Sequence, residues 1–324
     1  MTTKLCALLL VTTALIPLTA AAQGFKPTRP VEIVVHTGVG AGNDVIARVI
    51  SGILEKEQLL PVRSNVVNKP GGTGALAMAY LAERKGEPHV IAMYTAQWLT
   101  VPLMSREVRV QFHELTPIAN LVLDPAVIVV KADAPYRSLA DFIEAARKNP
   151  GQLRQPGSSV ESRANLIRLI LQRRSGASWT HIPYPSGADR ITALLGGHAH
   201  IYIGDPPEVN EHVNSGSLRV LVQIAEKRLP TFSNVPTMQE AGFENPNILS
   251  VRGMIAPPGL PKEVVSYWEN LFARMVKTES WRKYVVDSQV EEWYLRSHEL
   301  GKLAEDIVAQ RRQLFTEFGI KMAR

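Results

Sequence analysis

The stretch VEIVVHTGVGAGNDVIA, residues 31–47, decides the fold of this chain. Its apolar start predicts a strand at Val31–Val35, and the closely spaced glycines after it predict a sharp turn. A helix is expected to begin near Asn43 and Asp44. Free N–H groups and the positive end of the helix dipole would then face outward. Since such a helix start can hold an anion, we expect this loop to capture the carboxylate of a small solute.

The order of strand, polar turn and helix recurs further along the chain. Strands are expected at residues 62–67 and 89–93, and the second is followed by a polar turn at Thr95, Ala96 and Gln97. The motif NKPGGTGALAMA, residues 68–79, predicts another glycine turn that leads into a helix. This alternation predicts an α/β fold in which mostly parallel sheets are flanked by helices.

A second domain is expected after two short apolar runs in residues 115–130. There, Ser138 is expected to cap a helix over residues 139–148, and a long helix is expected over residues 161–174. After Pro236 the character changes, and the C-terminal helices are expected to return to the first domain because they need a sheet face to cover. The predicted division is 1–22 for a signal peptide, 23–123 for the first part of domain 1, 124–236 for domain 2 and 237–324 for the return to domain 1.

The N-terminal segment predicts export to the periplasm. Lys4 is followed by an apolar run over residues 5–18 and by small residues that end at Ala22, a pattern typical of a secretory signal cleaved after Ala22. The apolar run is too short to span a bilayer comfortably, and no later apolar segment reaches roughly 18 residues. The single cysteine, Cys6, would leave with the signal peptide, so the mature chain is expected to form no disulfide.

The charge balance favours a small anionic ligand over nucleic acid. The formal net charge is +6, a modest excess. The arginine pairs at residues 173–174 and 311–312 are interpreted as solvated helix faces. Because no arginine-rich tail or interleaved aromatic stripe is present, no nucleic-acid partner is expected.

Two other binding chemistries are weighed against the residues. The glycines at residues 38–42 resemble part of a dinucleotide fingerprint, but Asn43 replaces the third glycine and no acidic residue ends the next strand. His198 and His200 have a spacing that can bind metal, but only Asp205 is nearby as a third ligand. We therefore expect no nucleotide cofactor and no metal.

An enzymatic alternative is also considered. A hydrolase could be built from Ser158 or Ser159 with His181 and Asp205, yet the chain lacks a G-x-S-x-G elbow and nothing in the sequence fixes their geometry. We interpret His181 as a brace of the second domain. Among the aromatic residues, Trp98 beside the polar turn is the candidate for stacking against an aromatic acid.

Five motifs in order resemble a known family. They are RPVEIVVHTGVGAGNDVIAR, VVNKPGGTGALA, HIPYPSGADRITALLGGHAHI, GSLRVLVQIAEKRLPTFSNVPTMQEAGF and GMIAPPGLPKEVV. Together they cover nearly all of the mature chain and resemble the extracytoplasmic solute receptors of tripartite tricarboxylate transporters, the Bug family. The resemblance implies a monomeric two-domain periplasmic binding protein of type II, a Venus flytrap without a cofactor. It would hold a dicarboxylate, aromatic acid or amino acid between the domains and deliver it to the membrane subunits of a transporter.

The resemblance also implies the binding residues. Ligand contacts are expected from three groups of loops. The first-domain loops contribute Thr37, Gly38, Val39, Gly40, Ala41, Gly42, Asn43, Asp44, Thr95, Ala96 and Gln97, with Asp44 ordering its loop; the second-domain loop contributes Ser158, Ser159, Ser162 and Arg163; a strand end contributes Gly204 and Asp205.

The chain departs from the family pattern in both loops. Relatives usually place prolines and glycines where this chain has His36, Thr37 and Val39, and they often carry a histidine where Arg163 stands. Arg163 is expected to pair directly with a carboxylate. Glu161 would repel an anion unless it turns back to cap Ser158. A transport receptor and a periplasmic sensor that reports occupancy to a signalling partner both fit these features.

Overall fold

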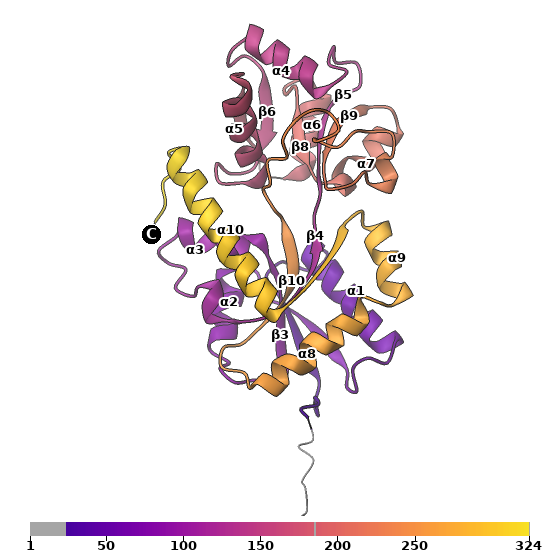
Figure 1. The fold of residues 1–324 in the computed structure, drawn as a ribbon, viewed down its shortest axis with the longest axis vertical. Coiled ribbons are helices and arrows are strands. Elements are labelled where there is room, and N and C mark those ends of the chain that lie inside the picture. The colour runs from indigo at the N-terminus through magenta and orange to yellow at the C-terminus, as the bar shows by residue number, and fades with distance from the viewer. Residues whose placement is uncertain (1–23, 185, 324) are drawn as a thin grey trace, which may run out of the picture.

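The computed structural model describes residues 24–184 and 186–323, so the predicted signal peptide and its cleavage site lie outside the described residues. Figure 1 shows two lobes stacked along the long axis of the molecule, joined by a few extended segments. The chain builds most of the lower lobe, crosses to the upper lobe, and then returns.

The lower lobe contains a six-stranded sheet with helices on both faces (Figure 1). Its strand order is β11-β4-β10-β3-β1-β2. The strands are β1 (Val31–Val35), β2 (Ser64–Asn68), β3 (Val90–Thr95), β4 (Thr116–Leu123), β10 (Val251–Ala256) and β11 (Glu291–Arg296). The helices are α1 (Gly42–Lys56), α2 (Ala75–Ala82), α3 (Ala96–Met104), α8 (Lys262–Met275), α9 (Glu279–Asp287) and α10 (Ser297–Glu317).

The upper lobe contains a three-stranded sheet in the order β8-β5-β9 and a separate pair, β6 with β7. The strands are β5 (Ala126–Lys131), β6 (Arg154–Gly157), β7 (Thr180–Pro183), β8 (Tyr202–Gly204) and β9 (Leu218–Ile224). The helices are α4 (Leu139–Lys148), α5 (Arg163–Ser175), α6 (Gly187–Leu195) and α7 (Pro206–Asn214).

The two-lobed α/β architecture agrees with the prediction, but the expectation of mostly parallel sheets is wrong. Strand β1 runs parallel to β2 and β3, and β6 runs parallel to β7. In contrast, β10 is antiparallel to β3 and β4, β11 is antiparallel to β4, and β5 is antiparallel to β8 and β9. The reason is the connection between the lobes: β4 leads out of the lower lobe and β10 leads back into it, so the two strands run in opposite directions.

Local sequence signals fix several elements. Strand Val31–Val35 and helix Leu139–Lys148 have the predicted bounds, and the Ser138 side chain accepts a hydrogen bond from the Asp141 N–H as a cap. Two predictions are wrong. Residues 95–97 are not a free turn, because α3 begins at Ala96 directly after β3, and the helix expected from residue 161 begins later, at Arg163, where Ser162 is the N-cap.

Helix α10 packs against both lobes, as its diagonal path in Figure 1 indicates. Leu300 and Ile307 lie in a core cluster of the lower lobe, whereas Leu314 and Phe315 lie in the core of the upper lobe. Met238 and Ile248 also pack in the upper core. We therefore propose that the chain returns to the lower lobe at β10, later than the predicted boundary at residue 237.

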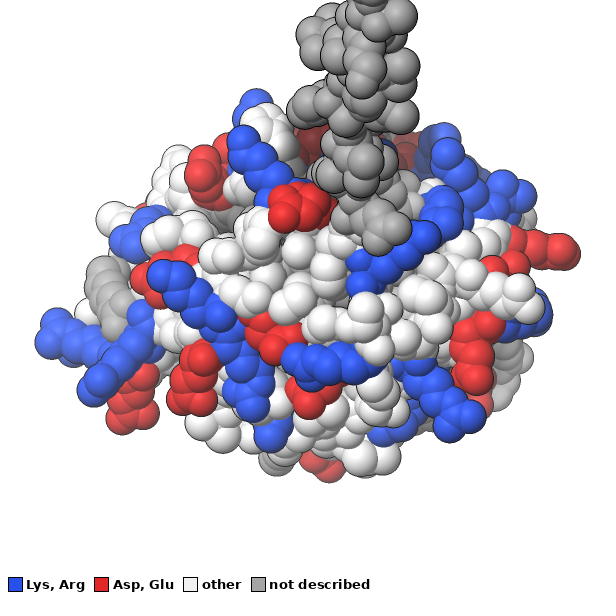
Figure 2. Space-filling view, turned by 90° about the horizontal axis from the view of Figure 1, so that it is seen from below, with Lys and Arg blue, Asp and Glu red and all other residues white. Residues whose placement is uncertain are grey.

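The surface below the lower lobe carries charges of both signs. Figure 2 shows Lys and Arg side chains interspersed with Asp and Glu side chains on this face. Among the helices of the described residues, none combines the length and the apolar character that a membrane crossing requires.

Candidate functional site

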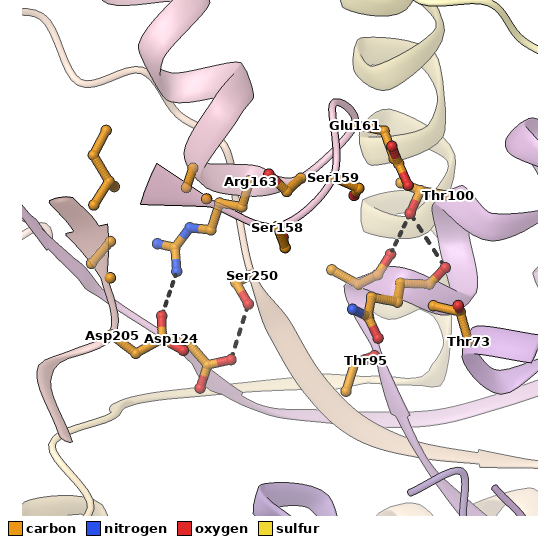
Figure 3. Close-up of a pocket in the computed structure, with 18 of the residues that line it drawn as sticks. Thr73, Thr95, Thr100, Asp124, Ser158, Ser159, Glu161, Arg163, Asp205 and Ser250 are labelled. Carbon is orange, nitrogen blue, oxygen red and sulfur yellow. Dashed lines mark hydrogen bonds and ion pairs between the residues drawn. The ribbon is translucent and has the colours of Figure 1, made fainter. Parts of the chain in front are cut away.

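A cleft of about 670 Å³ lies where the two lobes meet, and residues from both lobes and from the connecting segments line it. Figure 3 shows Ser158, Ser159 and Glu161 of the upper lobe facing Thr95 and Thr100 of the lower lobe. Because both lobes line this cleft, a solute in it would contact both of them.

The cleft brings together most of the residues that the sequence predicted. The lining includes Thr37, Gly42, Asn43, Thr95, Ala96, Gln97, Ser158, Ser159, Ser162, Arg163, Gly204 and Asp205. The outer part of the first loop does not line it: Gly38, Val39, Gly40, Ala41 and Asp44 are absent from its wall. Val39 is 77% exposed, so this part of the loop faces solvent. Contact with the solute stays a prediction for all of these residues.

Asp44 holds the first loop in shape from behind. Its carboxylate accepts hydrogen bonds from the Gly40 N–H at 2.9 Å and from the Asn68 side chain at 2.9 Å, and it pairs with Arg48 at 2.9 Å. The Arg48 guanidinium, the Gly40 N–H and the Asn68 amide hold the pKa of this carboxyl well below its usual range. Asn68 also donates to the Thr37 carbonyl at 2.9 Å, so β2 is tied to the same loop.

The buried His36 links Trp98 to Asn43, which lines the cleft. Trp98 Nε1 donates to His36 Nδ1 at 3.0 Å, and His36 Nε2 lies 3.3 Å from the Asn43 side-chain amide. Since Nδ1 accepts, the proton of the neutral ring belongs on Nε2, and the Asn43 amide accepts from it when it is turned to present its oxygen. Trp98 is fully buried and does not line the cleft, so the expectation that it stacks on an aromatic solute is wrong. Its role is to fix His36, and through it Asn43.

His36 predicts a pH dependence of stability. Burial lowers the pKa of His36 to about 4, against an unfolded value of 6.5, and its side chain is 6% exposed. Between pH 6.5 and pH 4 the imidazole is protonated in the unfolded chain but stays neutral in the folded chain. The contribution of neutral His36 to the free energy of unfolding is therefore complete above pH 6.5 and is lost as the pH falls toward 4. We expect the free energy of unfolding to lose up to about 3 kcal/mol through this group.

Urea unfolding between pH 4.5 and pH 7.5 measures this effect. The difference between the wild-type protein and His36→Gln isolates the group from other buried histidines, and the variant should lose stability less steeply as the pH falls. Parallel pH profiles for the two proteins would contradict a neutral, buried His36.

Gly40 predicts a second effect, on the shape of the loop. Gly40 has φ +80°, a left-handed conformation in which a β-branched residue is strained, whereas a side chain at Gly40 or at Gly38 would meet open space. A valine at Gly40 therefore does not fill an anion site; it strains the backbone that presents the N–H to Asp44. We expect Gly40→Val to weaken solute binding at least fivefold and to cost about 1–2 kcal/mol of stability.

Gly38→Val is the matched control, because Gly38 is in the same loop, has equal space and lacks the positive φ. Calorimetric titration should show a much smaller loss of affinity for this control than for Gly40→Val. Equal affinities of the two variants would show that the left-handed conformation at Gly40 does not contribute to solute binding.

The lower lobe presents two helix starts to the cleft. Neither the N-cap of α1, Ala41, nor that of α3, Thr95, makes a side-chain capping bond. The buried hydroxyls of Thr37 and Thr95 also have no hydrogen-bond partner within the described residues. Free N–H groups, positive dipole ends and unpaired hydroxyls on one wall form a suitable receptor for a carboxylate.

The upper lobe contributes a capped helix and two arginines. Ser162 caps α5 by accepting from the Asn165 N–H. Arg163, the first residue of α5, donates from Nε to the Ile248 carbonyl and from Nη1 to the Pro125 carbonyl, both at 3.2 Å. These carbonyls belong to the two segments that connect the lobes. The buried Nε of Arg190, also in the cleft wall, has no partner within the described chain.

Charged residues at the connecting segments were missed by the sequence reasoning, and the interpretation of Arg311 as part of a solvated helix face is wrong, because Arg311 is buried and lies in the cleft wall. Asp124 pairs with Arg252 at 2.8 Å and accepts from Ser250 Oγ at 3.0 Å, and Arg311 of α10 donates to the Leu249 carbonyl at 3.1 Å. All four side chains reach the cleft wall. The available signal was a charge in an apolar run: Asp124 follows LVL, and Arg252 interrupts a buried strand.

The acidic groups in the cleft interact with one another. Burial raises the pKa of the Asp205 carboxyl; the Arg163 guanidinium, whose Nη1 lies 3.6 Å away, opposes this shift, and Asp124 and Glu208 add to it. A carboxylate beside other carboxylates is disfavoured as an anion, so a positive charge in this region would be stabilised.

The side chains considered for a metal site and for a hydrolase make other contacts in the structure. Within the described residues, no group of three or more His, Cys, Asp or Glu is arranged for a metal ion. His200 Nδ1 instead accepts from the Arg154 N–H. The buried His181 Nε2 makes no hydrogen bond to a serine in the described chain, and Asp205 pairs with Arg163. His181 packs against Gly157, where an added Cβ would lie 2.2 Å from its Nε2, in agreement with a bracing role.

Comparison with known proteins places this geometry in a family. Residues 46–320 match the family described as the tripartite tricarboxylate transporter family receptor. A Cupriavidus necator protein, described as a UPF0065 protein in the gbd 5′ region, is 28% identical over 313 residues, which are 96% of this chain and 94% of the relative.

Solved structures of similar proteins share the fold. A TctC solute-binding protein from Polaromonas has a TM-score of 0.76 and 28% identity, and the match covers 90% of this chain and 99% of that chain. A protein from R. palustris, solved with adipate, has a TM-score of 0.77 and 25% identity, and the match covers 90% of this chain and 98% of that chain.

Proposed function

Because this chain belongs to the receptor family of the tripartite tricarboxylate transporters, we propose that it is a periplasmic receptor that captures a small organic acid in the cleft between its lobes. It then delivers the acid, as a monomer, to the membrane subunits of such a transporter. The similar protein from R. palustris was solved with adipate, a small dicarboxylate, which supports the ligand class. On this proposal the protein binds its ligand and does not convert it.

One observation carries the proposal: buried hydrogen-bonding atoms without partners gather on the cleft wall. Thr37 Oγ1 and Thr95 Oγ1 lie on the lower lobe and Arg190 Nε lies on the upper lobe. An unpaired buried polar atom costs free energy, and a bound carboxylate with its two oxygens would satisfy donors on both lobes.

The magnitudes are consistent with a receptor. Hydrogen bonds to a charged acceptor contribute roughly 1.5–3 kcal/mol each, so four of them give about 6–12 kcal/mol before the costs of association. Micromolar affinity needs about −8 kcal/mol, so the part of the solute beyond one carboxylate also has to contribute. Only a solute that contacts both lobes favours the closed arrangement, and this difference allows a membrane partner to distinguish loaded from empty receptor.

A thermal-shift screen of the purified protein tests the proposal. Dicarboxylates, aromatic acids and amino acids are added at high excess, with the methyl ester of each acid as the matched control that lacks the negative charge. A true ligand at a hundred times its Kd stabilises the folded protein by roughly 2.7 kcal/mol. Stabilisation by no acid, or equal stabilisation by acid and ester, would refute a carboxylate receptor.

A further inference from the structure

The cleft is neutral in formal charge. Its lining contains four arginines and four acidic residues: Arg163, Arg190, Arg252 and Arg311 with Asp124, Glu161, Asp205 and Glu208. A site that takes only anions benefits from an excess of positive charge, since this excess attracts the ligand and offsets its desolvation. The balance here fits a ligand that carries both signs.

One acidic atom in this set is buried and unpaired. Asp124 is 4% exposed, and its Oδ2 accepts from Ser250 and from Arg252. Its Oδ1 is also buried and has no hydrogen-bond partner within the described residues, although Asp124 lines the cleft. A carboxylate oxygen accepts only, so a donor supplied from the cleft is what would satisfy it.

The surroundings of Asp124 favour a positively charged donor. Figure 3 shows Asp124, on a connecting segment, beside Asp205, which follows β8 of the upper lobe, and their mutual repulsion disfavours the charged form of Asp205. Glu161 is a further acidic side chain on the cleft wall. An ammonium group placed here would be attracted by these carboxylates, whereas a neutral hydroxyl would gain one hydrogen bond and little else.

The lower lobe supplies the complementary part. The starts of α1 and α3, with the unpaired Thr37 and Thr95 hydroxyls, favour a negative group. The Arg252 guanidinium adds positive charge at the start of α1, because a methyl group at Gly42 would lie 3.4 Å from Arg252 Nη1. One cleft therefore offers a region for an anion and a region for a cation.

We propose that the solute is an amino acid whose ammonium group donates to Asp124 Oδ1 while its carboxylate binds at the start of α1 and α3. This assignment rests on the proposed receptor function and narrows its ligand class. Asp124 is thus the residue that selects amino acids against the corresponding acids without an amino group.

Matched ligand pairs test the assignment by calorimetric titration of the full-length mature protein. The pairs are aspartate with succinate, glutamate with glutarate, and leucine with 4-methylpentanoate; malate replaces the amino group of aspartate by a hydroxyl. In at least one pair the amino member should bind tenfold or more tightly than its partner, and malate should bind no better than succinate.

The variant Asp124→Asn separates recognition from structure. It keeps the shape of the side chain but removes its charge, and it frees Arg252 from its ion pair. The variant should bind the amino acid at least tenfold more weakly, whereas its affinity for the unsubstituted acid should fall by much less or rise. Asp133→Asn is the control, because Asp133 pairs with Lys131 and its side chain is 70% exposed; it should keep wild-type affinities.

The outcomes distinguish two failures. If the unsubstituted acid binds as tightly as its amino partner in every pair that binds, the assignment of Asp124 is overturned and the receptor function stands. Equal losses of both pair members in Asp124→Asn, or equal binding of malate and aspartate, also overturn a site for a cation. If no acid of either kind binds, the receptor function itself fails, and the assignment fails with it.

Discussion

Replacing Arg163 by alanine is expected to weaken binding of the solute by tenfold or more. The guanidinium reaches the cleft wall, and its Nε and Nη1 are bonded to the Ile248 and Pro125 carbonyls. Its Nη2 lacks a partner among the hydrogen bonds of the described residues and remains able to donate to an anion. The direct pairing expected from the sequence stays a prediction, and it would use Nη2, while Nε and Nη1 hold the connecting segments.

The size of the effect follows from charge. Tenfold corresponds to about 1.4 kcal/mol, which is less than one hydrogen bond to a charged acceptor contributes. Alanine also leaves Asp205 and Asp124 with less positive charge beside them, so an approaching anion would be repelled. Both consequences act against a carboxylate.

Two further variants sharpen the test. Arg163→Lys keeps the charge, but a single ammonium group cannot reproduce the planar fork, so intermediate affinity is expected. Arg173→Ala, at the far end of α5, removes a side chain that is 53% exposed and should leave affinity unchanged. Calorimetric titration gives the affinities and a thermal melt monitors folding. Wild-type affinity of a folded Arg163→Ala protein would exclude Arg163 from the site.

Replacing Gly253 by alanine is expected to cost about 3 kcal/mol of stability, the upper part of the range for overpacking a core. Gly253 lies in β10, between β3 and β4. An added Cβ would lie 2.2 Å from the Ala119 carbonyl oxygen and 2.8 Å from Asn120 Cα. Both are backbone atoms of β4, which cannot rotate away as a side chain could, so the strand pair would have to separate.

Gly52→Ala provides the control for this effect. Gly52 lies within α1, and an added methyl group there would meet nothing within 4 Å. Alanine in a helix interior is favoured over glycine by roughly 0.5–1 kcal/mol, so this variant should be at least as stable as the wild-type protein. Urea unfolding compares the three proteins. Equal midpoints for Gly253→Ala and Gly52→Ala would show that β4 and β10 are not held as closely as the structure indicates.

The elements that could be predicted from the sequence are those that depend on neighbouring residues alone. Ser138 and Asp141 are three positions apart, so the capping box at the start of α4 can be recognised from the sequence alone. The strand at Val31–Val35 and the glycine turn after it were predictable for the same reason. So was the role of Asp44, whose carboxylate accepts a hydrogen bond from the N–H of Gly40, four residues away. Most residues predicted for the site do line the cleft, because loops at strand ends converge there.

Features that join distant parts of the chain could not be predicted in this way. The direction of β5 and β10 depends on the crossing between the lobes, which no local pattern encodes. Trp98 was the aromatic candidate for stacking on a solute, but the fold places His36, 62 positions away in sequence, against its indole N–H.

The sequence by itself determined the family, the strand and glycine loop that begins the fold, and the helix caps, because each depends on residues that are close together along the chain or on whole motifs. Only the tertiary structure decided which charges meet in the cleft. Asp124 and Arg252 are separated by 128 positions, yet they pair at 2.8 Å because β4 leaves the lower lobe beside the strand by which the chain returns. A contact of this kind follows from how strands are ordered in a sheet, and neither residue shows it alone.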